Sequence, residues 1–259
     1  MTNKWLKVAL MATAIATGTS INIDAETVLY VPQDDRPVSL QYTVDTAREA
    51  GMTVLTPPQH LISGKTYQGQ ADQIMAWVEQ NAGRADVMVL STDTLIYGGL
   101  VDSRKHNIPL STLQNRLKRI EGLKARNKNV RIYGFGTVMR SPRASGGGTE
   151  PAYYAEYGPT IFQIAALQDK LDSGSLTQEE TQKLMSLQAS VPVEYLQDWF
   201  DRRQKNMKIN KELIDETRSG VFDYFALGHD DTSQLSQSAL EGRYLNKYSK
   251  DISVEKYGS

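Results

Sequence analysis

The sequence predicts an α/β fold made of parallel β-α units. Short β-branched apolar segments alternate with longer amphipathic segments that are typical of helices, and no hairpin signal separates one apolar segment from the next. Strands bounded by helices in this way pair in parallel through right-handed crossovers. About five strands are predicted, an arrangement that resembles the N-terminal part of a (β/α) barrel. An open doubly wound parallel sheet is the alternative.

Each predicted strand is a short apolar run that stops at a proline, a glycine or a polar cluster. The first run, 27–31, stops at Pro32, and the second stops at Pro57 and Pro58. These residues end a strand because proline lacks an N–H donor, and because turns favour glycine and short polar side chains. In chain order, strands are predicted at 27–31, 52–55, 86–90, 130–135 and 222–227.

The predicted helices are amphipathic, and the first two end at Gly51 and Gly83, since glycine is common at helix C-termini. In chain order, helices are predicted at 40–50, 70–82, 111–127, 161–171 and 196–214. The last two lie in a segment of about 160–218 that we interpret as a helical insertion into a single α/β domain, residues 26–259. A complete eight-unit barrel takes about 250 residues, so we expect the chain to be too short to close one.

The N-terminal segment has the pattern of a secretion signal. Lys4 and Lys7 precede an apolar run over 8–16, and Ala25 provides a small residue for cleavage. A membrane anchor is the alternative, but a hydrocarbon core of about 30 Å requires about twenty apolar residues. We therefore predict a signal peptide over residues 1–25, a secreted or periplasmic protein, and no membrane association after cleavage.

The composition excludes several classes of chemistry. The chain has no cysteine, which removes disulfides, thiolate metal sites and cysteine nucleophiles. Lys and Arg number 29 against 30 Asp and Glu, so the basic surplus of a nucleic-acid-binding protein is missing. The glycine-rich segment 145–149 lacks the lysine of a P-loop and the spacing of a dinucleotide site. We therefore expect no nucleic-acid partner and no cofactor.

Polar side chains follow four of the five predicted strands. The carboxyl ends of parallel strands share one rim, where α/β folds bind ligands, so these side chains are expected to converge on one site. For any single Asp, a helix N-cap or a turn is the simpler interpretation, but two Asp-Asp pairs and a third carboxylate on one rim favour a site. The clusters are Gln33-Asp34-Asp35-Arg36, Ser91-Thr92-Asp93, Met139-Arg140 and His229-Asp230-Asp231.

Four sequence blocks stand in order along the chain: Val-Pro-Gln-Asp-Asp-Arg-Pro-Val at 31–38, Asp-Thr-Leu-Ile-Tyr-Gly-Gly-Leu-Val-Asp-Ser-Arg at 93–104, Val-Met-Arg-Ser-Pro at 138–142 and Gly-His-Asp-Asp at 228–231. Together they resemble the family catalogued as domain of unknown function 4127. The resemblance covers nearly the whole mature chain. It departs from the family at Gln33, where a Leu is usual.

Members of this family have been assigned as glycoside hydrolases, namely endo-D-arabinanases, so the resemblance implies an exported enzyme that cleaves a furanose-containing polysaccharide. Such cleavage uses two carboxyl groups, one as acid and one as base or nucleophile. The catalytic candidates are Asp34, Asp35, Asp93, Asp230 and Asp231. The candidates for substrate binding are Arg36, Tyr97, Arg104, Arg140, Glu150, Tyr154 and His229.

Other interpretations stay open from the sequence. Tyr97 and Tyr154 suit a sugar subsite, but a tyrosine is more often ordinary packing. Asp34, Asp230 and His229 allow a divalent-metal hydrolase, although their spacing is not specific and no metal is predicted. A non-catalytic carbohydrate-binding protein is the third hypothesis, because the chain stops near the point where the family's second half is expected to begin.

Overall fold

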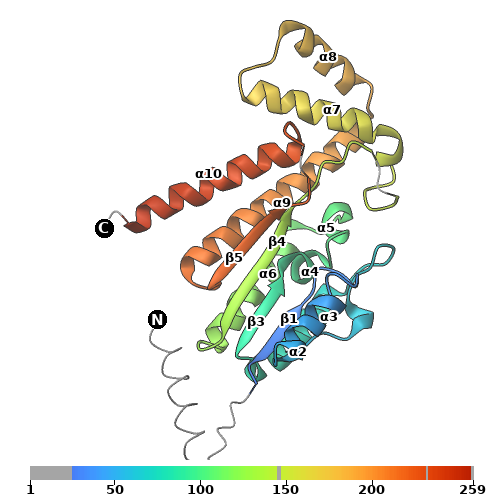
Figure 1. Ribbon diagram of the computed structural model, residues 1–259. Helices are drawn as coiled ribbons and strands as arrows, with labels where there is room; N and C mark the ends of the chain where they lie inside the picture. The colour runs from blue at the N-terminus through green and yellow to red at the C-terminus, as the bar shows by residue number, and fades with distance from the viewer. Residues whose placement is uncertain (1–24, 145–146, 232, 258–259) are drawn as a thin grey trace, which may run out of the picture.

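The computed structural model describes residues 25–144, 147–231 and 233–257, and of residues 251–257 it describes only the backbone. Five strands form one parallel sheet in the order β2-β1-β3-β4-β5 (Figure 1). This confirms the predicted α/β fold with parallel strands. The strands are β1 (Thr27–Val31), β2 (Thr53–Leu55), β3 (Val87–Ser91), β4 (Arg131–Val138) and β5 (Tyr224–His229).

The strand order decides where the chain changes direction across the sheet. Strand β1 lies between β2 and β3, with Leu29 paired to Leu55 on one side and to Met88 on the other. This is an order of the open doubly wound sheet, which the sequence left as the alternative, whereas strands of a barrel follow one another in chain order. The point where the order reverses, between β1 and β3, is where such sheets bind ligands.

Helices connect the strands and extend beyond the sheet. They are α2 (Gln41–Glu49), the 3-10 turn η1 (Gln59–Leu61), α3 (Ala71–Asn81), the 3-10 turn η2 (Ala82–Arg84), α4 (Thr92–Tyr97), α5 (Asp102–Lys105), α6 (Leu110–Arg126), α7 (Tyr154–Asp172), α8 (Gln178–Ala189), α9 (Val193–Ser219) and α10 (Gln237–Tyr257). The five predicted helices correspond to α2, α3, α6, α7 and α9. Helices α4, α5, α8 and α10 were not predicted.

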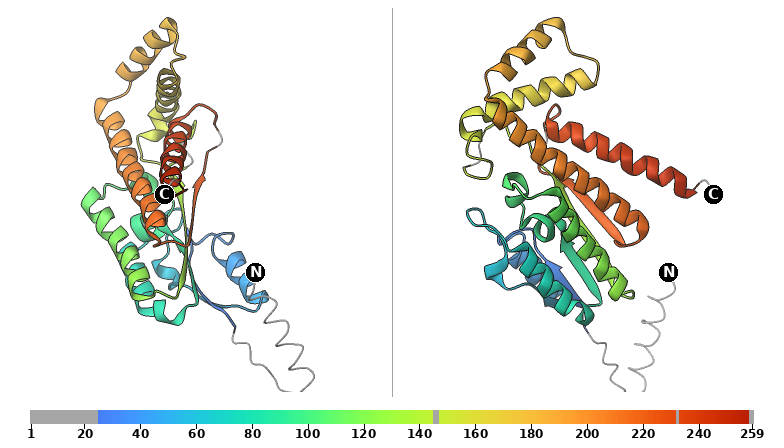
Figure 2. Two further views of the ribbon diagram at one scale, coloured as in Figure 1. Left: turned by 90° about the vertical axis from the view of Figure 1, so that its left-hand side faces the viewer. Right: turned by 180° about the vertical axis from the view of Figure 1, so that it is seen from behind.

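The main core lies on one face of the sheet. Leu29 and Met88 on the strands pack against Ile74 of α3, Leu117 of α6 and Ile209 of α9, all of them buried. Figure 2 (right) shows α6 and α9 in front of this face. Alternate strand residues point to opposite faces, so burying one alternate set against helices is what specifies the register.

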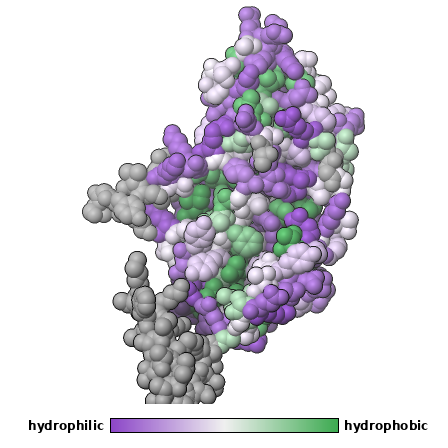
Figure 3. Space-filling view, in the orientation of Figure 1, coloured by the Kyte–Doolittle hydropathy of each residue, from purple (hydrophilic) through white to green (hydrophobic). Residues whose placement is uncertain are grey.

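The opposite face of the sheet is only partly covered. Helix α2 packs at its β2 end, while Val89 and Tyr133 near the centre are half-buried and Tyr224 on β5 is exposed. Figure 3 views the molecule in the orientation of Figure 1, and hydrophobic residues are visible in the middle of the surface. The helices therefore cover the two faces of the sheet unequally.

A second apolar cluster forms where the helical insertion meets the end of β4. Tyr154 and Ile161 of α7, Leu184 of α8 and Trp199 of α9 are buried there together with Met139. Helices α7 and α8 form a hairpin that projects beyond the sheet (Figure 1). The predicted insertion is thus three helices with an apolar centre of their own.

The predictions of a signal peptide and of no membrane association concern the N-terminal segment and the helices. Residues 1–24 of the predicted signal peptide lie outside the described residues, and that prediction remains one. Within the described ranges, no helix is both long enough and apolar enough to cross a membrane.

Candidate functional site

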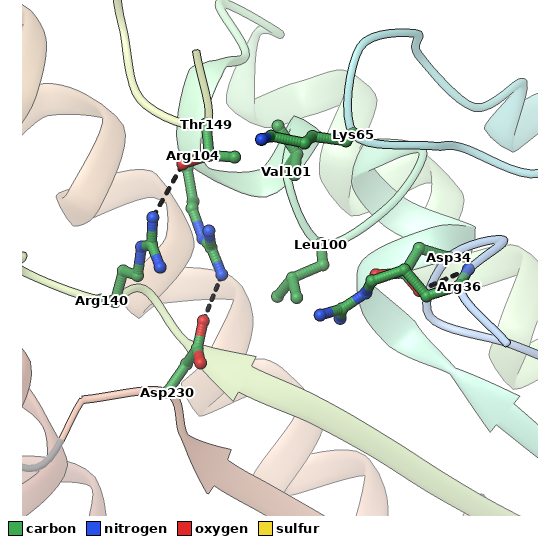
Figure 4. A pocket seen from close by; sticks show the side chains of 9 residues that line it. All are labelled: Asp34, Arg36, Lys65, Leu100, Val101, Arg104, Arg140, Thr149 and Asp230. Atoms are coloured by element: carbon green, nitrogen blue, oxygen red, sulfur yellow. Dashed lines mark hydrogen bonds and ion pairs between the residues drawn. The ribbon is translucent and has the colours of Figure 1, made fainter. Parts of the chain in front are cut away.

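A pocket of about 300 Å³ opens at the carboxyl ends of the strands (Figure 4). Its walls come from the segments that follow β1, β3, β4 and β5, and from the loop before α3. It lies at the reversal of strand order, as expected for a doubly wound sheet. The lining residues are Asp34, Arg36, Lys65, Leu100, Val101, Arg104, Arg140, Thr149 and Asp230. Five of the predicted site residues therefore meet here: Asp34, Arg36, Arg104, Arg140 and Asp230.

Asp34 and Arg36 form one side of the pocket, in a turn between Pro32 and Pro37. Asp34 accepts hydrogen bonds from the backbone N–H of Arg36, at 3.2 Å, and from its Nε, at 2.8 Å. The hydrogen bond to Asp34 raises the pKa of the Arg36 guanidinium. The Asp34 carboxylate is thus fixed in a rigid turn, while the Arg36 side chain stays half exposed beside the cavity.

Arg104 and Asp230 form an ion pair across the pocket from Asp34 (Figure 4). Arg104 is on the short helix α5, and its side chain is only 4% exposed, whereas the side chain of Asp230 is 40% exposed. Burial lowers the pKa of Arg104, and the charge of nearby Arg140 lowers it further. An arginine stays protonated at neutral pH, so a buried guanidinium at this wall requires negative partners.

Arg140 is held from several directions. Its Nε donates to Oε1 of buried Glu150 at 2.8 Å, and its Nη2 donates to Oγ1 of Thr149 at 2.8 Å. The carbonyls of Met139 and Arg140 accept hydrogen bonds from Arg203, at 2.6 and 2.9 Å. Arg203 thereby fixes the backbone from which Arg140 reaches the pocket.

Glycines bring two loops together at the edge of the pocket. The N–H of Gly69 donates to Oδ2 of Asp102 at 3.0 Å, and a Cβ on Gly69 would overlap the carbonyl oxygen of Gly98. Gly98 has a φ of 111°, which L side chains rarely adopt. The two loops therefore approach closely at the Gly98-Gly99 pair, and this approach places the loop carrying Lys65 opposite Leu100.

Asp93 lies in the protein interior and does not line the pocket. It is 2% exposed and accepts hydrogen bonds from Nε2 of Gln33, at 3.0 Å, and from Oγ1 of Thr137, at 2.8 Å. Burial raises the pKa of Asp93 to about 6, and the two side-chain donors oppose that rise. It sits in the first turn of α4, whose N-cap is Ser91, so part of the polar cluster after β3 serves to begin a helix.

The two remaining catalytic candidates, Asp35 and Asp231, accept hydrogen bonds from neighbouring residues of the protein. Asp35 accepts a hydrogen bond from the hydroxyl of Tyr67, and its backbone N–H binds the carbonyl of Ser63 at 2.9 Å. Asp231 accepts from the backbone N–H of Ser141 at 3.1 Å and of Ser233 at 2.8 Å. Within each Asp-Asp pair, the first carboxylate faces the pocket and the second holds a turn.

The predicted tyrosines pack in the interior. Tyr97 is 7% exposed and lies against His106, with 4.9 Å between ring centroids. Tyr154 is fully buried beside Trp199, and its hydroxyl donates to the carbonyl of Pro142 at 2.7 Å. The alternative of ordinary packing therefore describes both rings. Tyr154 thereby also holds the backbone at Pro142, two residues after Arg140.

His229 and Glu150 complete the predicted set. His229 ends β5, is exposed, and lies against Gly242 of α10, where it lines a different surface hollow. Glu150 lies behind Arg140 rather than in the cavity wall. Within the described part of the chain, no group of three or more His, Asp or Glu side chains is arranged to hold a metal ion.

Sequence reasoning missed Lys65 and the supporting residues Arg203 and Glu241. Lys65 follows Gly64 in a loop between β2 and α3, and a lysine in a loop carries no signal of its own. Arg203 is 1% exposed and pairs with Glu241 through two hydrogen bonds of 2.7 Å. The sequence feature that could have indicated Arg203 is its position in α9, a helix whose buried residues include Trp199 and Ile209.

Comparison with known proteins identifies a family for most of the chain. Residues 28–258 match the family described as "Protein of unknown function (DUF4127)". No curated protein and no solved structure matches the chain. The match is to the family that the four sequence blocks resemble, and it extends from β1 to the end of the last described helix.

Proposed function

The chain belongs to the DUF4127 family, and from this membership together with the pocket geometry we propose that it is an exported glycoside hydrolase that cleaves a furanose-containing polysaccharide. The observation that carries the proposal is that Asp34 and Asp230, from segments almost two hundred residues apart, line one pocket. The export rests on the predicted signal peptide, and the substrate class rests on the resemblance of the four sequence blocks.

Hydrolysis of a glycosidic bond suits two carboxyl groups that face one cavity. One carboxylate attacks the anomeric carbon or activates a water, and one carboxylic acid protonates the leaving oxygen. The proposal assigns the first role to Asp34, because the backbone and the guanidinium of Arg36 hold it in one orientation. It assigns the second role to Asp230, the other carboxyl group that lines the pocket, because its side chain is more exposed than that of Asp34.

The test is release of oligosaccharides from arabinan by the purified protein, followed by chromatography. Asp34→Asn and Asp230→Asn are each expected to lower the rate by at least about 100-fold, the usual contribution of acid–base groups. Asp45→Asn is the matched control, since this exposed residue of α2 lies outside the pocket.

Three outcomes would contradict the proposal. Full activity of both pocket variants would remove these carboxylates from the mechanism. Binding of arabinan without any turnover would favour the non-catalytic hypothesis. Loss of activity on addition of a chelator, restored by a divalent cation, would favour the metal-dependent hydrolase.

A further inference from the structure

We propose that the pocket binds an oxyanion, a phosphate or carboxylate group carried by a sugar, through Lys65, Arg104 and Arg140. The inference rests on the proposed function, since it concerns the substrate of the same pocket. It narrows that substrate from any furanose-containing polysaccharide to one that bears negative charge next to the bound sugar.

Hydrogen-bond donors face the cavity without partners of their own. A guanidinium has five N–H donors, yet in the part of the chain that the structure describes only Nη2 of Arg104 makes a hydrogen bond, to Asp230. Arg140 uses Nε and Nη2, which leaves Nη1. No carboxylate among the described residues lies within 4 Å of the Lys65 ammonium group, which lines the pocket.

Most carboxylate oxygens in and behind the pocket wall already accept a hydrogen bond from the protein. Both carboxylate oxygens of Asp34 accept hydrogen bonds from Arg36. Both oxygens of Glu150 accept as well, Oε1 from Arg140 and Oε2 from the hydroxyl of Thr149 at 2.9 Å. The pocket therefore favours a ligand that supplies acceptors, and oxyanions form the strongest such hydrogen bonds with guanidinium and ammonium groups.

The arrangement of charge favours the same ligand. Four lining side chains are cations and two are carboxylates, while Glu150 and Asp93 lie behind the wall. Arg104 and Arg140 are close enough for the charge of one to act on the other. An anion bound between two like charges lowers their electrostatic repulsion. The cavity of about 300 Å³ is at the lower end of the usual size for small-molecule sites, so it suits one charged sugar unit.

The proposal is tested by calorimetric titration of the full chain with D-arabinose 5-phosphate, D-galacturonate, D-arabinose and inorganic phosphate. At least one of the two charged sugars is expected to bind at least tenfold more tightly than arabinose, and its affinity should fall as salt is added. The charged sugar that binds more tightly identifies the anion as phosphate or carboxylate. Inorganic phosphate is expected to bind more weakly than that sugar, because it makes no contact with the sugar part of the pocket.

Variants locate the binding. Lys65→Gln and Arg104→Gln are each expected to weaken the charged sugar at least tenfold, and the exposed loop position of Lys65 keeps this variant folded. Arg126→Gln is the matched control, because this exposed arginine of α6 pairs with Glu79 away from the pocket. Equal affinity for charged and neutral sugars, or unchanged affinity in the folded Lys65 variant, would overturn the proposal. Arabinan cleavage is measured separately, so binding of a charged sugar without cleavage contradicts only the hydrolase assignment.

Discussion

Asp93 gives the most direct quantitative prediction, because its carboxyl group is almost completely buried. Its pKa is about 6 in the folded protein against an ordinary value of 3.8. The folded protein therefore holds this proton more tightly than the unfolded chain, and ionisation of Asp93 lowers the free energy of unfolding as pH rises from about 4 to 7. At about 1.4 kcal/mol per pH unit, the loss amounts to about 3 kcal/mol. Asp93→Asn removes the ionisation and therefore this loss.

The assay is urea unfolding of wild type and Asp93→Asn at several pH values between 4 and 7.5. The informative quantity is the difference in unfolding free energy between the two proteins, which should shift in favour of the variant by about 3 kcal/mol over this range. The difference is needed because His106, whose pKa burial lowers to about 4, contributes a slope of the opposite sign in both proteins. Asp45→Asn, an exposed change of the same chemistry, should give a constant difference. A constant difference for Asp93→Asn as well would refute the reasoning.

Three further predictions concern stability. In wild type, His106 takes up a proton on unfolding, so its contribution lowers the free energy of unfolding by about 3 kcal/mol as pH falls from 6.5 to 4. His106→Gln should abolish this contribution, and parallel urea profiles of the two proteins would contradict the prediction. Glu241→Gln should lower the free energy of unfolding by about 3 kcal/mol, since it leaves the buried guanidinium of Arg203 without its charged partner, and a loss under about 1 kcal/mol would count against that role. Gly69→Ala should cost about 1–3 kcal/mol, because its Cβ would overlap the carbonyl oxygen of Gly98, and an unchanged Tm would show that the two loops separate freely.

The sequence predicted the strand positions well because each strand is short, apolar and clearly ended. It placed β1 at its observed bounds, whereas β4 continues to Val138, three residues beyond the predicted end. The extra residues include Gly136. A glycine predicts a strand end from sequence, but here a side chain at this position would overlap the hydroxyl of Thr92. Strand order was left open, because it depends on how the crossover helices pack and not on any local signal.

Some helices escaped prediction for identifiable reasons. Helix α4 has only six residues and all of them are buried, so it shows no polar face. Helix α7 begins at Tyr154, before Pro159, and a proline within a helix argues against continuing it across that point. In both cases tertiary packing determines the conformation, and periodicity alone does not report it.

The convergence of polar clusters at one rim could be predicted, but the role of each member could not. In both Asp-Asp pairs, no local pattern indicates which carboxylate faces the cavity. The structure distinguishes Asp34 and Asp230 from Asp35 and Asp231 by their hydrogen-bond partners. Asp93 ends in the interior because Thr137 and Gln33 reach it from neighbouring strand ends, a relation between residues far apart in the chain.

Helix α9 has a mechanical consequence for the pocket. Its 27 residues span about 40 Å, and it belongs to both apolar clusters, through Trp199 near one end and Ile209 farther along. Arg203 lies between Trp199 and Ile209 in the helix, and its guanidinium donates hydrogen bonds to the carbonyls of Met139 and Arg140. Arg203 therefore connects the Arg140 wall of the pocket to the helix against which the α7–α8 hairpin packs, so the position of that wall depends on both apolar clusters.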